Sequence, residues 1–397
     1  MKDTIREYFA VTPPGLEDLC VREMIQLGLV PQEQIHGGIA FSGGLRELYL
    51  ANLSLRTASR VLVRLGRLTA RDFPSLYQRL VRLPWGRYIK PGDACDVRVV
   101  SHRSRLSHSG RIAEVCQEAI ARALGAAPGQ GAVCQTVLLR LEEDRVDVSL
   151  DSSGEHLHRR GYRRARSAAP LRENLAAAAL LACGYDGTLP LIDIMTGSGT
   201  FVTEAALIAL HRAPGQGRRF AFMHWPKYRE GLWQQLLGNA RDEARDVLPA
   251  PILGIDSNPR ALDAARQNIA SAGLEGQVEI RCEQLQQLEP LSPTGLLIGN
   301  PPYGARLGKS ARLQGFYAEL EDLCAGPFAA WQTALLCPAE VVQRMRRVDF
   351  QPLLRFSHGG IKVGLYLKKP VAVRGIPLTC DGSGSISSSS CSDQTDL

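Results

Sequence analysis

The sequence lacks the patterns that mark several large protein classes. Its ten cysteines form no Cys-x-x-Cys pair and stand mostly in apolar surroundings, which indicates small buried side chains rather than disulfides or ligands. The histidines lack metal-ligand spacing (His102, His108, His156, His158). The start of the chain has no apolar signal-peptide core, and no run approaches the roughly eighteen apolar residues of a membrane span. We therefore expect a cytoplasmic protein that needs no metal.

What the sequence does contain is arginine. The net charge of +7 is carried almost entirely by this residue, and the segment 51–110 holds twelve Arg or Lys against three Asp. A second cluster lies within 159–166. Guanidinium groups fork onto phosphate oxygens and stack on bases, so this distribution predicts a polyanionic partner, although solvated faces would give the same pattern. The candidate RNA contacts are Arg56, Arg60, Arg64, Arg103, Arg105, Arg159, Arg160 and Arg163.

Hydrophobic periodicity divides the 397 residues into two parts that differ in character. Up to about residue 151, short strands and helices are mixed as in a small α+β domain. Strands are expected at 7–11, 37–41, 60–68, 94–101, 135–141 and 145–150, and helices at 16–27, 44–53, 73–81 and 109–124. A basic connector (156–163) and an alanine-rich helix ending near Cys183 follow.

Beyond Cys183, strands and helices alternate with the short connections of βαβ units, which predicts an open, mostly parallel sheet. These elements are expected at 191–194, 200–211, 252–256, 259–272, 278–282 and 296–299, with late strands at 331–336 and 362–368. The run 359–367 looks like a closing hairpin. A long insertion, 213–249, carries Trp225 and Trp233 and is expected to be functional. The Ser/Gly-rich end should be disordered.

The first motif with chemical content is a glycine turn after a strand. Asp193 ends the strand, and Thr196-Gly197-Ser198-Gly199-Thr200 leads into a helix. The spacing differs from G-x-G-x-x-G, and no lysine follows to make a P-loop. Two glycines allow a ligand to approach the backbone, and the helix N-terminus suits a carboxylate. Asp193 can accept from a ligand ammonium group.

The next two units supply polar groups at strand ends. Asp256, followed by Ser257, can take both hydroxyls of a ribose, although Asp256 could instead belong to the cap of the following helix. Glu283 or Gln284 after the third strand could reach an adenine amino group. Glu204, one turn into the first helix, could cap backbone groups or hold the methionine end of a cofactor.

The sharpest signal is Asn300-Pro301-Pro302-Tyr303 at the end of an apolar strand. The amide oxygen of Asn300 and the carbonyl of Pro301 can accept from an exocyclic amine and fix its lone pair toward a methyl sulfonium. The prolines hold the loop rigid, and Tyr303 offers a stacking face for an unstacked base. Together with the glycine turn, this motif predicts in-line methyl transfer from S-adenosylmethionine to a nucleobase nitrogen.

These motifs resemble the bacterial THUMP-domain methyltransferases that form N2-methylguanine in 23S ribosomal RNA. The resemblance runs from about Tyr8 to Pro370 and includes the segments 55–62, 152–163 and 169–176. It implies an α/β Rossmann-like methyltransferase domain after an α+β ferredoxin-like and THUMP region that binds RNA. The implied boundaries are 1–42 (ferredoxin-like), 43–153 (THUMP), 154–378 (methyltransferase) and 379–397 (tail).

The resemblance also implies site residues. The cofactor contacts would fall on Asp193, Gly197, Gly199 and Asp256, with Glu173 and Asn174 near the cofactor, and the clamp on Asn300, Pro301 and Tyr303. Some family members carry a second methyltransferase domain; the sequence ends before one, so we expect that second activity to be absent.

The leading hypothesis is therefore an rRNA guanine-N2 methyltransferase, whose partner is 23S rRNA or a large-subunit assembly intermediate. The alternatives are the same reaction on tRNA, methylation of adenine N6, and a non-enzymatic ribosome-assembly protein with a vestigial cofactor fold.

Overall fold

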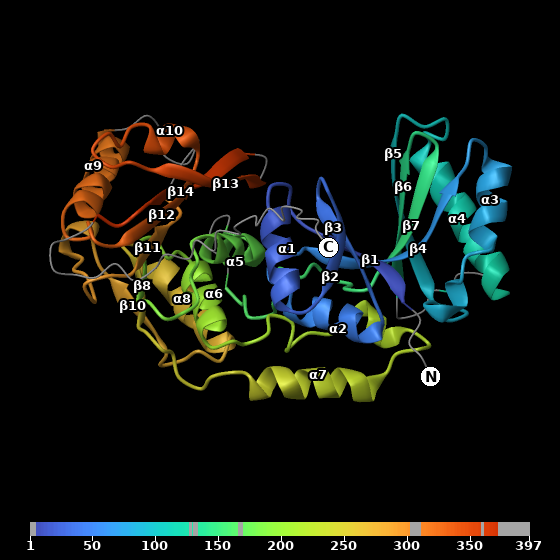
Figure 1. The fold of residues 1–397 in the computed structure, drawn as a ribbon, viewed down its shortest axis with the longest axis horizontal. Coiled ribbons are helices and arrows are strands. Elements are labelled where there is room, and N and C mark those ends of the chain that lie inside the picture. The colour runs from blue at the N-terminus through green and yellow to red at the C-terminus, as the bar shows by residue number, and fades with distance from the viewer. Residues whose placement is uncertain are drawn as a thin grey trace, which may run out of the picture.

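The computed structural model describes residues 5–126, 129, 134–165, 170–301, 311–358 and 361–371. Two seven-stranded sheets organise these residues: Figure 1 shows the sheet within residues 191–368 (β8–β14) at the left end of an elongated molecule and the sheet within residues 6–151 (β1–β7) extending from its middle to its right end. We refer to residues up to 153 as the N-terminal half and to those from 154 on as the C-terminal half. Among the described residues, no helix is both long and apolar enough to cross a membrane.

The N-terminal half contains strands β1–β7 and helices α1–α4. In chain order they are β1 (Arg6–Val11), α1 (Glu17–Gln26), β2 (Val30–Ile35), β3 (Gly38–Gly43), α2 (Leu45–Ser54), β4 (Arg60–Thr69), α3 (Phe73–Val81), β5 (Ala94–His102), α4 (Ser109–Leu124), β6 (Cys134–Glu142) and β7 (Arg145–Asp151). The sheet order is β2-β3-β1-β4-β7-β6-β5, and only the β5–β6 pair is parallel. The predicted mixture of strands and helices is confirmed, whereas β2 had no sequence prediction.

The long strand β4 lies in the middle of this sheet and connects its two sides. It pairs antiparallel with β1 on one side and with β7 on the other. Val61 and Val63 are buried in the main core of this half and Leu62 in a separate small cluster, while Arg64 and Arg67 stand among the acidic residues of neighbouring strands. The sheet runs without a break across the proposed boundary between residues 42 and 43, and that boundary stays a prediction.

The C-terminal half contains a Rossmann-like sheet of order β10-β9-β8-β11-β12-β14-β13. Its elements are α5 (Glu173–Ala182), β8 (Leu191–Asp193), α6 (Thr200–Ala209), α7 (Glu230–Asp242), β9 (Ile252–Asp256), α8 (Pro259–Ser271), β10 (Val278–Cys282), β11 (Leu296–Gly299), α9 (Ala311–Ala325), β12 (Gln332–Cys337), α10 (Ala339–Val342), β13 (Gln351–His358) and β14 (Ile361–Lys368). The strands from β10 to β12 are parallel, and β14 and β13 close the sheet antiparallel. The predicted strand β14 pairs with β13, while Gly359 and Gly360 lie outside the described residues, as does the tail 379–397.

The insertion at 213–249 forms a strap, which is the name we use for these residues. The strap leaves the C-terminal half after α6, packs on the N-terminal half and returns at β9. Its aromatic side chains Phe222 and Trp233 lie against Tyr49 of α2, with Phe222 and Tyr49 stacked at 4.3 Å. Trp225 donates from Nε1 to Gln135 Oε1 at 3.1 Å. Figure 1 shows α7 running beside α2, so the strap completes the N-terminal core.

The two halves also meet directly through α1. Leu16 and Leu19 belong to the same apolar cluster as α5 and α6. The Arg56 guanidinium donates to the carbonyls of Leu207 and Arg212 near the end of α6. Apolar contacts, buried hydrogen bonds and the strap therefore hold the halves in one arrangement.

Candidate active site

The carboxyl ends of three neighbouring parallel strands meet at one edge of the second sheet. In register, Asp193 of β8 pairs with Gly254 of β9 and with Ile298 of β11. Asn300 follows β11 by one residue. Ligands of open α/β sheets bind outside the carboxyl ends of the strands, so this edge is the place to look for a site. The structure thus brings the glycine turn and the start of the Asn-Pro-Pro-Tyr motif together.

The glycine turn is built by two residues with positive φ. Gly197 has φ +53° and Gly199 has φ +82°, a region that favours glycine. A Cβ at Gly199 would also lie 3.2 Å from the Cβ of Ala265, so this position allows α6 and α8 to approach closely. Helix α6 begins at Thr200 and directs its first backbone N–H groups toward the strand edge. This geometry provides donors for an anionic group.

Asp193 is the least satisfied carboxylate at this edge. Its side chain is 1% exposed, and Oδ1 accepts from the Met195 N–H at 3.2 Å. Oδ2 is buried and makes no hydrogen bond of ordinary geometry. Burial raises the pKa of Asp193 to about 7, although the nearby Thr196 hydroxyl lowers it somewhat, and the charge of Asp256 adds a smaller contribution in the same direction as burial. A carboxylate kept dry with a free acceptor fits a cationic ligand group.

Asp256 shapes the turn as well as facing the edge. Its Oδ2 accepts from the Gly197 N–H at 3.0 Å, and its Oδ1 accepts from the Asn258 N–H at 2.9 Å. Each carboxylate oxygen has about two acceptor positions, so both retain capacity for ribose hydroxyls. The helix cap itself is Asn258, whose side chain accepts from Arg260 N–H. The ribose contact stays a prediction.

Register also locates the adenine candidates. Cys282 of β10 pairs with Asp256 of β9, so Glu283 follows the strand beside Asp256. Its carboxylate lies 3.9 Å from Arg281. Gln284 precedes a short 3₁₀ turn, Leu285–Gln287. Both residues therefore stand at the cofactor edge, and neither is assigned to adenine by the structure.

Asn300 provides a second unsatisfied acceptor. Its Oδ1 is buried without a hydrogen-bond partner, and Pro301 beside it is buried. Pro302 and Tyr303 lie outside the described residues, so the predicted stacking face is not placed. Because a buried polar atom without a partner costs free energy, two such oxygens at neighbouring strand ends indicate a site shaped for a ligand.

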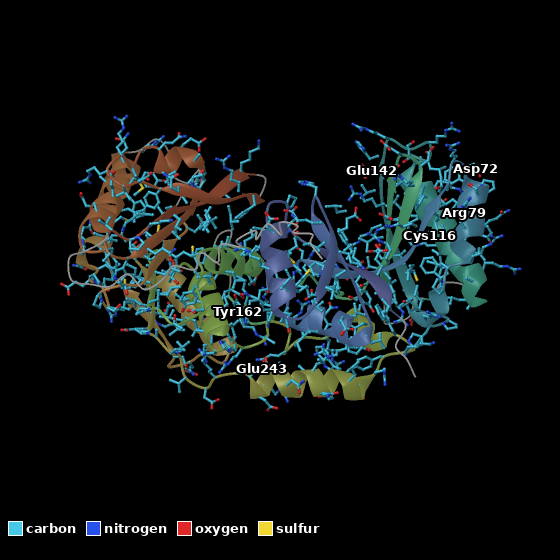
Figure 2. The ribbon with its side chains drawn as sticks, in the orientation of Figure 1. Asp72, Arg79, Cys116, Glu142, Tyr162 and Glu243 are labelled. Carbon is cyan, nitrogen blue, oxygen red and sulfur yellow. The ribbon has the colours of Figure 1, made fainter. Side chains whose placement is uncertain are left out.

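Three other predicted cofactor residues are engaged with the connector and the N-terminal half. Glu173 pairs with Arg163 at 3.0 Å, and Glu204 accepts from the Tyr162 hydroxyl at 3.2 Å and faces Arg160 at 3.6 Å. Figure 2 shows Tyr162 between the two halves, beside α6. Asn174 donates weakly to Thr57 O and Ser59 Oγ, while its Oδ1 is buried without a partner. Asn174 therefore joins the two halves, whereas Glu173 and Glu204 hold the connector against α5 and α6. Glu204 Oε2 is also buried without a hydrogen-bond partner.

The predicted RNA-binding arginines divide into two groups. Arg56 and Arg160 are directed into the protein, where they donate to main-chain carbonyls, and Arg163 is held by Glu173, Leu171 O and Thr200 Oγ1. Arg60 pairs with the buried Asp151, and Arg64 lies among Glu7, Asp147 and the Phe9 ring. Desolvation lowers the pKa of Arg56. The exposed members are Arg103, Arg105 and Arg159.

A residue that sequence reasoning missed connects the turn to the connector, which in the structure we take to extend from residue 156 to Ala165. Asn268 of α8 is 1% exposed and makes four hydrogen bonds, to Arg164 N, Ala165 N, Ala165 O and Ser198 O. The available signal was a polar residue on the buried face of α8, next to Ile269 and one turn after Ala265. Asparagine there is unfavourable unless its amide is satisfied.

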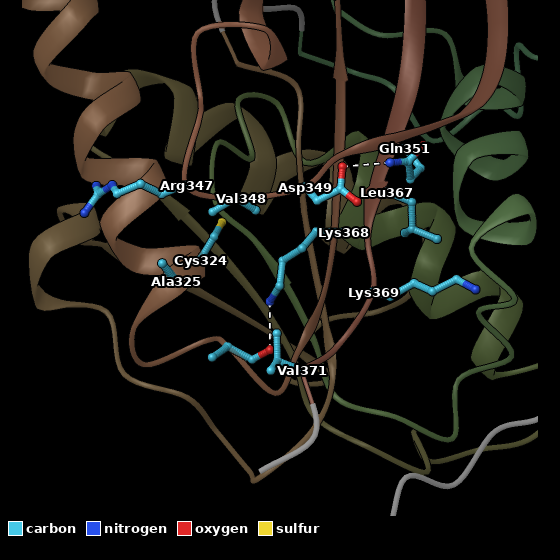
Figure 3. Close-up of a pocket in the computed structure, with 11 residues that line it drawn as sticks. Cys324, Ala325, Arg347, Val348, Asp349, Gln351, Leu367, Lys368, Lys369 and Val371 are labelled. Atoms are coloured by element: carbon cyan, nitrogen blue, oxygen red, sulfur yellow. Dashed lines mark hydrogen bonds between the residues drawn. The ribbon is translucent and has the colours of Figure 1, made fainter.

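A cavity of about 300 Å³ lies elsewhere in the C-terminal half. Cys324, Arg347 and Lys368 are among its lining residues, and Figure 3 shows Lys368 extending along it. The Lys368 ammonium donates to the carbonyls of Phe328, Ala329 and Trp331 at 2.9–3.0 Å, which uses its three protons. This lysine therefore fixes a loop. Across the described ranges, no group of three His, Cys, Asp or Glu side chains could hold a metal ion.

Comparison with known proteins agrees with this geometry. A family described as "RMKL-like, methyltransferase domain" matches residues 160–347, and one described as "RlmL ferredoxin-like domain" matches residues 7–62. "Putative RNA methyltransferase slr0064" of Synechocystis sp. is 32% identical over 90% of this chain and 95% of its own length. This chain belongs to the RMKL-like methyltransferase family. The predicted S-adenosylmethionine-dependent methyltransferase family and the Rossmann-like fold are therefore confirmed.

Two further similarities bear on this RMKL-like chain. "Ribosomal RNA large subunit methyltransferase K/L" of Methylococcus capsulatus is 37% identical over 83% of this chain, which spans 47% of that protein. The chain spans about half the length of most curated relatives that it matches. The crystal structure of "SMU.472, a putative methyltransferase complexed with SAH" is 30% identical, with a TM-score of 0.87, and the match covers 94% of this chain and 100% of that one.

Proposed function

We propose that this chain transfers a methyl group from S-adenosylmethionine to the exocyclic N2 of a guanine in 23S rRNA. The observation that carries the proposal is the pair of buried, unpartnered oxygens, Asp193 Oδ2 and Asn300 Oδ1, on neighbouring strand ends. One matches the ammonium of the cofactor and the other matches the amine of a base. The names of the relatives support ribosomal RNA as the substrate, and such a substrate would place the reaction in the cytoplasm.

The residues present fit S-adenosylmethionine. Asp193 would accept from its ammonium, the N–H groups of the Gly197–Thr200 turn would face its carboxylate, and Asp256 would take the ribose hydroxyls. Gly254 of β9 allows the glycine turn to pack closely on this strand, since a Cβ there would meet Thr196 Oγ1 at 2.7 Å. Bound there, the cofactor supplies an electrophilic methyl group on a sulfonium.

The base would be held by acceptors at the end of β11. Asn300 Oδ1 and the Pro301 carbonyl would accept the two amine protons, which directs the nitrogen lone pair away from the ring plane. The same two oxygens then stabilise the positive charge that develops on the nitrogen. Tyr303, in its predicted role, stacks on the extruded base.

Among the arginines predicted to bind RNA, the exposed ones are the best candidates for contacts with phosphate. Arg103, Arg105 and Arg159 stand on the surface, whereas Arg56 and Arg160 stabilise the junction of the halves. Phosphate contacts by exposed arginines would position RNA without reading its sequence.

The test is transfer of a labelled methyl group from S-adenosylmethionine to purified 23S rRNA and tRNA, followed by nucleoside analysis. N2-methylguanosine in 23S rRNA is the expected product. Label found only in tRNA would show that tRNA, not 23S rRNA, is the substrate. N6-methyladenosine as the product would show that the methylated base is adenine, since the clamp can hold either exocyclic amine. If the protein binds the cofactor but labels neither RNA, it does not methylate free RNA. The assay is then repeated with an assembling large-subunit particle, and no label there would favour a non-enzymatic assembly factor.

A further inference from the structure

Asn268 makes contacts that no motif accounts for. Its Oδ1 accepts from the Arg164 and Ala165 N–H groups at 2.8 and 3.0 Å. Its Nδ2 donates to Ala165 O at 3.1 Å and to Ser198 O at 3.0 Å. A carboxamide has two donors and two acceptor positions, so the side chain is saturated. Three segments distant in sequence meet at this one residue: the connector, the glycine turn and α8.

A second contact ties the connector to the same turn. Arg163 donates to Thr200 Oγ1 at 3.1 Å and to Leu171 O at 2.7 Å, while Glu173 neutralises its charge. The two anchor points, Ser198 and Thr200, flank Gly199, whose φ is +82°. The conformation of the turn is therefore fixed on both sides of Gly199, by Asn268 of α8 at Ser198 and by Arg163 of the connector at Thr200.

The connector is bound to the N-terminal half at its other end. Leu157 N–H donates to Ser59 O at 2.8 Å, and the Arg160 guanidinium donates to Arg56 O at 2.6 Å. A series of hydrogen bonds thus leads from residues 56–59, which precede β4, through the connector to Asn268 and Ser198. Each link is buried or half-buried, where hydrogen bonds are screened little by water.

We propose that Asn268 is a positioning residue that locks the connector onto the cofactor turn, so that cofactor binding and connector placement depend on each other. The proposal rests on the turn being the cofactor site. Asn268 itself touches no reacting atom; it fixes the Ser198 carbonyl so that the N–H groups of the turn stay directed toward the ligand. By linkage, a cofactor that orders the turn then orders the connector equally.

The test measures binding of S-adenosylhomocysteine to the full chain together with hydrogen exchange of the amides in 163–165 and 197–203. In the wild type, the ligand should slow exchange in both segments. Asn268→Ala should weaken binding about tenfold, and the ligand should no longer slow exchange in 163–165. Asn268→Asp keeps the two accepted bonds, loses both donated ones and places charge against two carbonyls, so it should weaken binding at least as much.

Two controls separate positioning from general stability. Asn52 is equally buried, donates to Leu48 O and Ser152 Oγ and accepts from Ser153 Oγ, all far from the turn. Asn52→Ala should lower the melting temperature but leave ligand affinity within twofold of the wild type. Gln267→Ala, on the exposed face of α8, should change neither.

The outcomes are distinguishable. If both Asn268 variants bind the ligand within twofold of the wild type and retain its effect on 163–165, the inference is overturned while the proposed function stands. If Asn268→Ala does not fold, the Asn268→Asp variant decides by the same two measurements. If the wild type binds no ligand, the proposed cofactor is wrong; the lock then stands only if Asn268→Asp speeds exchange in both segments of the ligand-free protein.

Discussion

Two buried acids at opposite sides of the connector show how similar side chains serve different ends. Glu23 of α1 accepts from Arg56 N–H, Thr57 N–H and Thr57 Oγ1, at the junction of the halves. Asp193 accepts one hydrogen bond of 3.2 Å and leaves Oδ2 without a partner. Burial raises the pKa of both carboxyls.

The difference lies in the number of donors that face each carboxylate. Evolution of a stable fold favours satisfied buried groups, as at Glu23, because an unpaired one costs about 1–3 kcal/mol. The unpaired oxygens of Asp193 and Asn300 are tolerated where a ligand can complete them. Burial alone does not distinguish Glu23 from Asp193, because both side chains are buried. The number of hydrogen bonds that each carboxylate accepts distinguishes the structural acid, Glu23, from the proposed binding acid, Asp193.

The largest effect on activity should follow removal of the unpartnered amide oxygen of Asn300. Asn300→Ala should lower single-turnover methyl transfer about 10³-fold, because the amine loses an acceptor in the transition state. Affinity for S-adenosylhomocysteine should stay within twofold, as measured by calorimetry. Asn239→Ala, an exposed asparagine on α7, is the control and should be silent. Turnover within threefold of the wild type would show that the clamp is misassigned.

Removing the buried acid at the junction of the halves should lower the stability of the fold without changing its affinity for the cofactor. Glu23→Ala leaves three buried donors without a partner, so the free energy of unfolding should fall by about 3 kcal/mol. Urea unfolding measures the loss, and ligand affinity of the folded variant should be unchanged. Asp18→Ala removes an exposed acid on the same helix that contacts only Gln34, and it should cost little. Equal losses in both variants would contradict the contrast.

Asp193→Asn should instead weaken ligand binding without lowering the stability of the ligand-free protein. A charge-assisted bond to the ligand ammonium contributes about 2 kcal/mol, so affinity should fall about 30-fold at about pH 8. The ligand-free variant should be more stable than the wild type at that pH, because the raised pKa makes the native Asp193 lose stability as pH rises through about 7. Unchanged affinity would remove Asp193 from the cofactor site.

The smallest effect is the pH dependence of the wild type. If the ligand binds the ionised form of Asp193, affinity should rise up to about tenfold per pH unit below the pKa of about 7 and level off above it. Calorimetry in buffers of different ionisation enthalpy would detect the released proton. The Asp193→Asn variant should flatten the profile; a slope that persists in that variant would have another origin.

The fold could be read from the sequence wherever periodicity was strong. Alternation along β4 and the apolar face of α4 gave their bounds to within one or two residues, because half-buried elements enforce the pattern. Strand β2 was missed because it is an edge strand with mostly exposed polar residues and a proline. Helix α7 was hidden within the insertion, whose apolar residues face another part of the chain.

The site was predictable where chemistry follows a strand directly. Asp193 and Asn300 stand at the ends of apolar strands, so local sequence places them. Arg56 looked like an RNA contact, but carbonyls about 150 residues later bind its guanidinium. Asn268 depends on partners in two distant segments. Contacts of such sequence separation have no local signal.

The strap has a consequence for the newly made chain. The aromatic face around Tyr49 and Tyr88 is covered by strap residues, which include Phe222, Trp225, Tyr228 and Trp233 and are translated well after the N-terminal strands. At roughly 5–20 residues per second, the ribosome needs several seconds to supply that cover. During this interval the nascent N-terminal half exposes an apolar surface, and we expect chaperones to bind it until α7 emerges.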